Sequence, residues 1–169
     1  MKKTKSLRVI ACAAVCAALS IVLGKFAAIP IGNTIRISFE NLPIIFCSVA
    51  FGPAVGGACG AVADLLGCLL RGYDINPLIT LGAGSIGLTA GLLWRALPNL
   101  RLGLRTQISV FAGHAVGSIV INSLALHLFY NYPWSVLVTR IPNALVLAAV
   151  NTVLVRLLLE NKTIRGIAQ

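Results

Sequence analysis

The chain alternates long apolar segments with short polar breaks. The apolar segments cover residues 7–23, 42–51, 54–70, 78–97, 108–130 and 141–159. A helix needs about 20 apolar residues to cross the hydrocarbon core of a bilayer, and most of these segments approach that length. Gly52-Pro53 separates the second segment from the third, because proline cannot continue a helix without losing a hydrogen bond. The pattern therefore predicts an all-α membrane protein, a single integral membrane domain over residues 1–169 with six transmembrane helices.

Two stretches depart from this simple pattern. The segment 42–51 is short for a bilayer, so we expect it to begin at the membrane surface near Phe39. The first polar break, residues 24–40, is too polar and too interrupted by proline and glycine to cross lipid. Within it, Ile35-Arg36-Ile37-Ser38-Phe39 alternates apolar and polar residues with period two, which predicts an extended segment or a short hairpin.

Composition places most of the surface in lipid. Only 11% of the residues are charged, against about a quarter in a soluble domain, and the mean hydropathy is +0.93. The net charge of +10 could indicate nucleic acid, but the basic residues lie at the ends of apolar segments, where they anchor helices. We therefore predict a lipid bilayer as partner and no nucleic acid. The N-terminal lysines and the apolar segment after them resemble a signal peptide, but further spans follow, so we expect a retained first helix.

The basic residues also predict the orientation in the membrane. Six spans put both termini on one side, and the opposite side then holds only Lys25, Arg36, Arg71 and Arg140 of the 14 Lys and Arg residues. Cytoplasmic loops carry an excess of Lys and Arg. The sequence therefore predicts a multi-pass protein of the cytoplasmic membrane with cytoplasmic N- and C-termini, whose first, third and fifth loops face outside.

The outer arginines are candidate ligand-binding residues. A guanidinium binds carboxylates through two parallel hydrogen bonds and stacks on flat rings. Arg36, Arg71 and Arg140 lie close in sequence to polar or aromatic residues, namely Ser38, Phe39, Tyr73, Asp74, Asn76 and Asn143. This set indicates an anionic small molecule with a planar ring. Lys25 is interpreted instead as a boundary residue whose ammonium reaches the membrane surface.

Asp64 is the one acidic residue expected deep inside a span. A charge in that position is costly and usually faces a cavity. Arg71 follows seven residues later, which is two helical turns and nearly the same face. Both side chains are therefore expected to face one cavity. The alternative is that Asp64 forms a hydrogen bond with a neighbouring helix.

Amides and small residues inside the spans have a structural interpretation as well as a functional one. His114, Asn122, Asn143 and Asn151 could join helices by hydrogen bonds; Asn143 is favoured for the pocket because it lies one turn from Arg140. Small residues four positions apart let helices pack closely. Such pairs are Gly56 and Gly60, Gly87 and Gly91, and Gly113 and Gly117, and the first span carries a continuous small face of Ala13, Ala14, Ala17 and Ala18. We expect that face to contact another protein.

The motifs of common enzyme classes are missing from the sequence. There is no Gly-x-x-x-x-Gly-Lys-Ser/Thr phosphate loop, no His-Glu-x-x-His zinc motif and no Gly-x-Ser-x-Gly elbow. The five cysteines lack metal-binding spacing and are interpreted as small packing residues. We therefore predict no catalytic residues, no metal and no cofactor. Uphill transport would need energy from another chain.

Several segments together resemble a known family. They are Ile35-Arg36-Ile37-Ser38-Phe39 leading to Pro43, then Phe51-Gly52-Pro53-Ala54-Val55-Gly56-Gly57, then Gly60-Ala61-Val62-Ala63-Asp64-Leu65-Leu66-Gly67, and finally Pro77 and residues 87–92. In these segments, in its length and in its alanine-rich first span, the chain resembles the substrate-binding S components of energy-coupling-factor (ECF) vitamin transporters. It is most similar to the folate branch, and the resemblance covers essentially the whole chain.

The resemblance implies a function. An S component of this kind binds a water-soluble vitamin, here folate, with high affinity in an outward-facing pocket capped by the first loop. It works with a transmembrane coupling (T) protein and two ATPase subunits and is not itself an enzyme. Alternatives are the same machine with another cargo, such as a queuosine precursor or pantothenate, an intramembrane enzyme acting on lipid, and a passive oligomeric channel.

The resemblance also implies roles for particular residues. The outer arginines would bind the glutamate carboxylates of folate, Asp64 would accept hydrogen bonds from the pterin, and Phe39, Tyr73 or Trp94 would stack on its ring. Asn76 and Asn143 complete the predicted substrate site. On the first span, the best match to the docking surface for the coupling protein is Ala14 with Ala18, and the shifted choice is Ala13 with Ala17.

Overall fold

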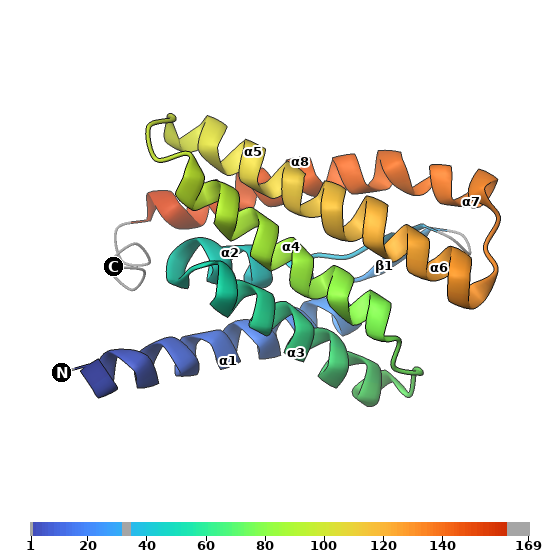
Figure 1. Cartoon of the computed structure of the whole chain (residues 1–169), viewed down its shortest axis with the longest axis horizontal. Coiled ribbons are helices and arrows are strands. Elements are labelled where there is room, and N and C mark those ends of the chain that lie inside the picture. The colour runs from blue at the N-terminus through green and yellow to red at the C-terminus, as the bar shows by residue number, and fades with distance from the viewer. Residues whose placement is uncertain (1, 32–34, 162–169) are drawn as a thin grey trace.

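The structure is a computed structural model that describes the backbone of residues 2–31 and 35–161 and the side chains of residues 6–28 and 38–161. Its elements, in chain order, are α1 (Lys2–Phe26), β1 (Ile29–Ile31), β2 (Ile35–Ile37), α2 (Asn41–Phe51), α3 (Pro53–Arg71), α4 (Pro77–Ala96), α5 (Leu102–His114), the π-helix η1 (Ala115–Ile121), α6 (Asn122–Tyr130), α7 (Trp134–Val138) and α8 (Arg140–Glu160). The helices form a bundle in which the start of α1 and the end of α8 lie at the same end (Figure 1).

The prediction of an all-helical membrane bundle is confirmed for five of the six segments. In the described part of the chain, five helical segments have the length and composition of membrane spans: Ser6–Phe26, Pro53–Arg71, Pro77–Ala96, Leu102–Tyr130 and Trp134–Glu160. The remaining apolar segment is α2, an 11-residue helix. At 1.5 Å per residue it extends about 17 Å, roughly half of the hydrocarbon thickness.

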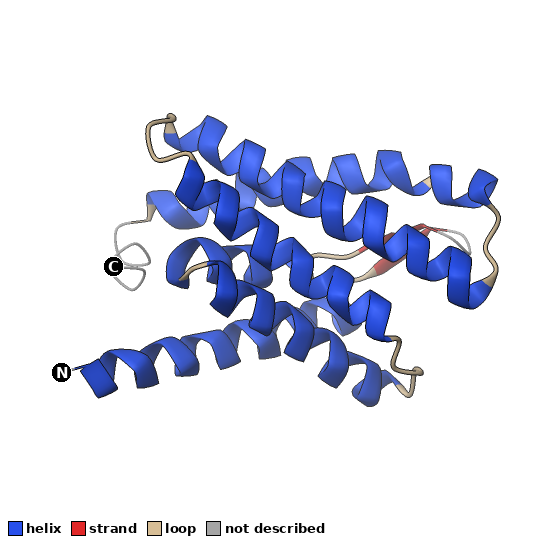
Figure 2. Cartoon of the chain, in the orientation of Figure 1, coloured by secondary structure: helices blue, strands red, loops and turns tan. Residues whose placement is uncertain are grey.

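Of the two forms expected for the polar break between α1 and α2, an extended segment or a short hairpin, the structure has the hairpin. Strands β1 and β2 pair antiparallel, with Pro30 opposite Arg36 (red in Figure 2). Strand β2 packs against α8. The hairpin therefore brings the first connection of the chain to the last helix of the bundle.

Turn residues mark the ends of the helices around α3 and α4. Gly52 has φ 110° between α2 and α3, and Gly72 ends α3 with φ 69°, in the region that favours glycine. Pro77 opens α4, and the Asn76 side chain accepts a hydrogen bond from the Leu78 amide at 3.0 Å. This is the geometry of a helix N-cap.

The fifth apolar segment is a longer helix than the sequence predicts. It begins at Leu102 rather than at residue 108, so the end of the polar break between residues 97 and 108 is already helical. Its middle is π-helical, from Ala115 to Ile121. Such turns are rare and occur frequently near functional sites.

Close backbone contact between α3 and α4 forms the centre of the bundle. A Cβ at Gly87 would overlap the backbone carbonyl of Gly56, and a Cβ at Gly60 would overlap the carbonyl of Ala83. The buried hydroxyl of Ser48 on α2 donates a hydrogen bond to the Gly87 carbonyl. The small-residue faces therefore pack helix against helix inside the bundle, as expected for membrane helices.

These contacts predict that Gly87→Ala destabilises the protein, whereas Gly57→Ala is tolerated. A Cβ at Gly57 has its nearest neighbour, the Gly84 carbonyl oxygen, at an ordinary 3.4 Å. Added volume in a packed core costs about 1–3 kcal/mol. Thermal unfolding in detergent should therefore show a lower midpoint for Gly87→Ala than for Gly57→Ala. Equal midpoints would contradict the close backbone contact described between α3 and α4.

Candidate ligand-binding site

A cavity of about 560 Å³ with a mixed polar and apolar lining lies at the end of the bundle opposite the start of α1 and the end of α8. It is enclosed where α3 ends, α4 begins, α6 ends and α8 begins, together with the segment that follows β2. The lining residues are Ser38, Glu40, Asn41, Asp64, Cys68, Arg71, Gly72, Tyr73, Asp74, Ile79, Ala83, Ile86, Ser118, Asn122, Tyr130, Arg140, Asn143, Ala144 and Leu147. The volume is in the range of small-molecule sites.

Asp64 and Arg71 share one wall of this cavity, as their spacing predicts. Asp64 Oδ2 accepts a hydrogen bond of 2.7 Å from Thr80 Oγ1 on α4. The structural alternative, a bond between Asp64 and a neighbouring helix, is therefore present as well. A carboxylate has about four acceptor positions, so this bond leaves Asp64 able to accept hydrogen bonds from a ligand.

Arg71 also forms an ion pair with an acidic residue that the sequence did not single out. Its Nη2 lies 3.4 Å from Glu40 Oε2. Its Nε is buried and has no hydrogen-bond partner among the residues whose side chains are described. The Nε–H of Arg71 therefore remains available to donate a hydrogen bond to a ligand, as far as the described side chains are concerned.

The opposite wall comes from α8, η1 and α6. Arg140 and Asn143 of α8 line the cavity, as predicted, together with Ser118 and Asn122. Arg140 Nη1 is buried and has no hydrogen-bond partner within the described side chains. Leaving a buried polar group unsatisfied costs about 1–3 kcal/mol. A ligand acceptor at this position would therefore gain a favourable interaction.

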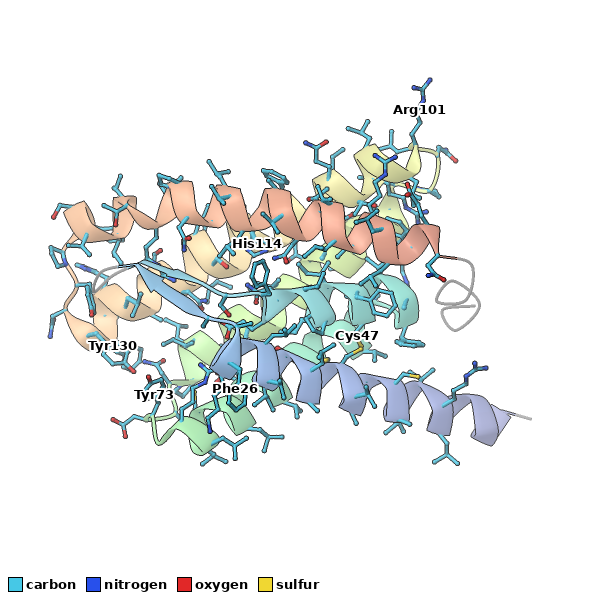
Figure 3. The ribbon with its side chains drawn as sticks, turned by 180° about the vertical axis from the view of Figure 1, so that it is seen from behind. Phe26, Cys47, Tyr73, Arg101, His114 and Tyr130 are labelled. Carbon is cyan, nitrogen blue, oxygen red and sulfur yellow. The ribbon has the colours of Figure 1, made fainter. Side chains whose placement is uncertain are left out.

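Two tyrosines stand at the mouth of the cavity. Tyr73, from the α3–α4 connection, and Tyr130, at the end of α6, both line it and lie at the same end of the bundle (Figure 3). Both are exposed. Tyr73 is a predicted site residue; Tyr130 was expected only as a boundary aromatic. Both therefore add an aromatic side chain to the lining of the cavity.

Trp94 lies elsewhere, which corrects the expectation that it stacks on the ligand. Its ring is covered by the Arg105 guanidinium, whose Cζ lies 4.0 Å from the ring centroid. Its carbonyl accepts a hydrogen bond of 2.7 Å from Arg105 Nε. Trp94 is fourteen residues after Thr80 on α4, which corresponds to about 21 Å along the helix. It therefore belongs to the end of the bundle that holds the chain ends.

Two further predicted site residues, Asn76 and Phe39, are not among those that line the cavity, and the side chain of a third lies outside the described residues. Asn76 is 6% exposed and caps α4. Phe39 is half-buried and does not line the cavity, although its neighbours Ser38 and Glu40 do. The backbone of Arg36 lies in β2, but its side chain is outside the described residues.

Several lining residues were not identified from the sequence. Cys68 lies one turn after Asp64 on the same helix face, so helical spacing could have indicated it. Glu40, Asn41 and Ser118 reach the cavity only through tertiary packing. No local pattern in the sequence marks them.

The interior amides below the cavity join helices, as interpreted from the sequence. His114 and Asn151 are 1% and 0% exposed. Asn151 Nδ2 lies 3.0 Å from His114 Nε2, which connects α8 to α5. The His114 ring, labelled in Figure 3, also lies 3.4 Å from Ser118 Oγ through its Nδ1. This cluster connects the π-helical segment to the rest of the bundle.

The alanine face of α1 divides into an inner and an outer row. Ala17 is 5% exposed and belongs to a buried cluster with Ile44 and Cys59, against which Ala13 packs. Ala14 and Ala18 are exposed. The outer row is therefore the more accessible of the two to another protein.

The described residues contain no group of three or more His, Cys, Asp or Glu side chains that could hold a metal ion. The cavity instead offers guanidinium donors, a carboxylate acceptor and aromatic faces. Groups of these kinds can form hydrogen bonds with a small polar molecule and stack on its rings.

Comparison with solved structures shows the fold. The chain is similar to a crystal structure of FolT bound with folic acid, with a TM-score of 0.69 and 23% identity over 86% of this chain and 89% of that chain. It is similar to the S component for biotin from an ECF-type ABC transporter, with a TM-score of 0.75 and 18% identity over 100% of both chains. An S component of a bacterial ECF transporter matches with a TM-score of 0.68 and 22% identity over 94% of both chains.

Comparison of the sequence gives a curated relative and a family. An uncharacterized protein of Mycoplasma pneumoniae (strain ATCC 29342 / M129 / Subtype 1), named as an MG313 homolog, is 36% identical over 93 residues, which are 55% of this chain and 32% of that protein. The chain therefore spans about a third of the length of this relative. The family model described as "ECF transporter, substrate-specific component" matches residues 8–159. The chain belongs to the family of substrate-specific components of ECF transporters, integral membrane proteins that bind vitamin substrates.

Proposed function

We propose that this protein is the high-affinity folate-binding subunit of an ECF-type ABC transporter that imports the vitamin. It binds folate from outside in the cavity described above, and it has no catalytic activity of its own. A transmembrane coupling protein and two ATPase subunits complete the transporter. The observation that supports the cargo is the pairing of guanidinium donors with the half-buried carboxylate of Asp64 in one cavity.

The chemistry of folate suits this cavity at both ends of the molecule. The amino-pyrimidine edge of a pterin donates hydrogen bonds, and Asp64 is an acceptor on the α3 wall. The glutamate carboxylates suit Arg71 and Arg140, each of which has a buried nitrogen without a partner among the described side chains. Tyr73 and Tyr130 would cover the pterin ring in place of Trp94.

The distribution of basic residues supports the proposed orientation. Arg101 lies at the end of the bundle that holds the chain ends, far from Tyr73 and Tyr130 (Figure 3). Arg105 is at that end as well, packed on Trp94. An excess of Lys and Arg marks the cytoplasmic side. Both termini are therefore proposed to be cytoplasmic, and the cavity then opens outward, with the first loop as its cap.

The exposed row of α1 is the proposed docking surface for the coupling protein. Ala14 and Ala18 are exposed and lie four residues apart. Small residues at this spacing let a second helix approach closely in lipid.

The cargo assignment predicts that the purified protein binds folate with no ATP present. Isothermal titration calorimetry in detergent measures this directly, with biotin, pantothenate and a queuosine precursor as comparison ligands. Absence of heat with folate and its reduced forms would exclude folate as the cargo. Preferential binding of a comparison ligand would reassign the cargo within the same family.

The cavity predicts that Arg71→Ala and Arg140→Ala each weaken folate binding. Hydrogen bonds to charged groups contribute about 1.5–3 kcal/mol, so we expect about a tenfold to hundredfold higher Kd. Arg156→Ala is the matched control, because Arg156 is an exposed arginine that pairs with Glu160 on α8 outside the cavity. A Kd that is unchanged in both cavity variants would show that the ligand binds elsewhere.

The docking surface predicts that Ala14→Trp and Ala18→Trp leave folate binding intact but stop uptake by cells that express the whole transporter. A tryptophan would hold the coupling helix away from α1. Ala149→Trp, at an exposed alanine of α8, is the control and should transport normally. Normal uptake by both α1 variants would place the docking surface elsewhere.

A further inference from the structure

The ion pair between Glu40 and Arg71 lies at the wall of the proposed folate site and connects distant parts of the chain. Glu40 directly precedes α2 and follows the hairpin, whereas Arg71 is the last residue of α3. Both residues line the cavity. The pair therefore places a carboxylate of the protein against a cation that the proposed function assigns to a carboxylate of the ligand.

The geometry of this pair is that of a weak contact. Glu40 Oε2 and Arg71 Nη2 are 3.4 Å apart, longer than the 2.7–2.9 Å that is typical of a charge-assisted hydrogen bond. Arg71 Nε has no partner among the described side chains. A carboxylate in the guanidinium plane would bond Nε and Nη2 together, and this bidentate arrangement is the stronger one. A ligand carboxylate bound in this way needs Nη2, the nitrogen that Glu40 contacts.

Helix α1 holds Glu40 in this position. The buried hydroxyl of Ser20 donates a hydrogen bond of 2.6 Å to the Glu40 carbonyl oxygen. At Gly24, one turn later, an added Cβ would overlap both Glu40 Oε2 and Arg71 Nη2. The missing side chain at Gly24 thus leaves room for the pair. Three elements, α1, α3 and the segment before α2, therefore meet at this contact.

We propose that Glu40 is an internal competitor for Arg71: its carboxylate occupies the guanidinium in the ligand-free protein, and the carboxylate of the substrate displaces it. This inference rests on the proposed function, because it takes the substrate to be a carboxylate. Binding then breaks the contact between α3 and the segment that lines the cavity before α2. The competition lowers the affinity for a carboxylate ligand and leaves neutral ligands unaffected.

A matched acidic residue in the same cavity separates competition from a general effect of charge. Asp74 also lines the cavity, and it forms no ion pair within 4.0 Å among the described side chains. Removing either negative charge makes the cavity more positive. Only removal of Glu40 releases Arg71.

The test measures folate binding by calorimetry for the wild type, Glu40→Gln and Asp74→Asn, each with Arg71 and in an Arg71→Gln background. Exposed or partly buried ion pairs are weak, so Glu40→Gln should tighten folate binding about two- to fivefold when Arg71 is present. In the Arg71→Gln background it should produce only the small change that Asp74→Asn also produces. Asp74→Asn should produce a smaller change that is equal in both backgrounds, and the affinity for 6-hydroxymethylpterin, which lacks a carboxylate, should not respond to Glu40→Gln.

Two results would overturn the proposal. Weaker folate binding by Glu40→Gln would show that Glu40 holds the ligand, and equal gains in both backgrounds would show a field effect without competition. If no variant binds folate, the cargo assignment fails. The interaction between Glu40 and Arg71 is then tested in the ligand-free protein, by thermal unfolding of Glu40→Gln, Arg71→Gln and the double variant. Non-additive shifts in the midpoint support the pair, and additive shifts reject it.

Discussion

The architecture depends on the close approach of α3 and α4. Between membrane helices there is no hydrophobic driving force, so association relies on packing and on hydrogen bonds. The contacts between the two helices recur about one turn apart, first between Gly56 and Gly87 and then between Gly60 and Ala83. The next step in the same register is the hydrogen bond between Asp64 and Thr80. The glycines thus determine where the Asp64 side chain is placed, and they fix the α3–α4 wall of the cavity.

Hydrogen bonds between helices fix the other wall. In lipid, polar groups must find partners inside the protein. His114 and Asn151 bond each other between α5 and α8 in a fully buried position. His114 also contacts Ser118 in the π-helical segment, and Ser118 lines the cavity. One polar cluster therefore joins two helices and also positions Ser118 on the cavity wall. These residues have a structural role and at the same time shape the candidate site.

Sequence reasoning succeeded where the information is local. Apolar length predicted the long helices, Gly52-Pro53 predicted the break between α2 and α3, and period-two alternation predicted an extended segment or a short hairpin, of which the structure has the hairpin. Helical spacing placed Asp64 and Arg71 on one wall. It failed where tertiary packing decides: Glu40 reaches Arg71 across 31 positions, and the π-helical turn of Ala115–Ile121 has no sequence signal that we used. The error for Trp94 was geometric, because its distance along α4 from the cavity follows from the helical rise alone.

The arrangement of charge in the cavity favours a ligand with two chemically different ends. Among the described lining residues, Glu40, Asp64 and Asp74 are acidic and Arg71 and Arg140 are basic, so the cavity is no simple anion trap. Asp64 is bonded to α4, whereas Arg140 projects from α8 with a buried nitrogen that lacks a described partner. A plain dicarboxylate would satisfy the arginines but would meet Asp64 as a like charge, and a plain cation would leave the guanidiniums unsatisfied. A molecule with a hydrogen-bond-donating ring at one end and carboxylates at the other suits both the acidic and the basic groups of the lining, and this is the chemistry of folate as the proposed cargo.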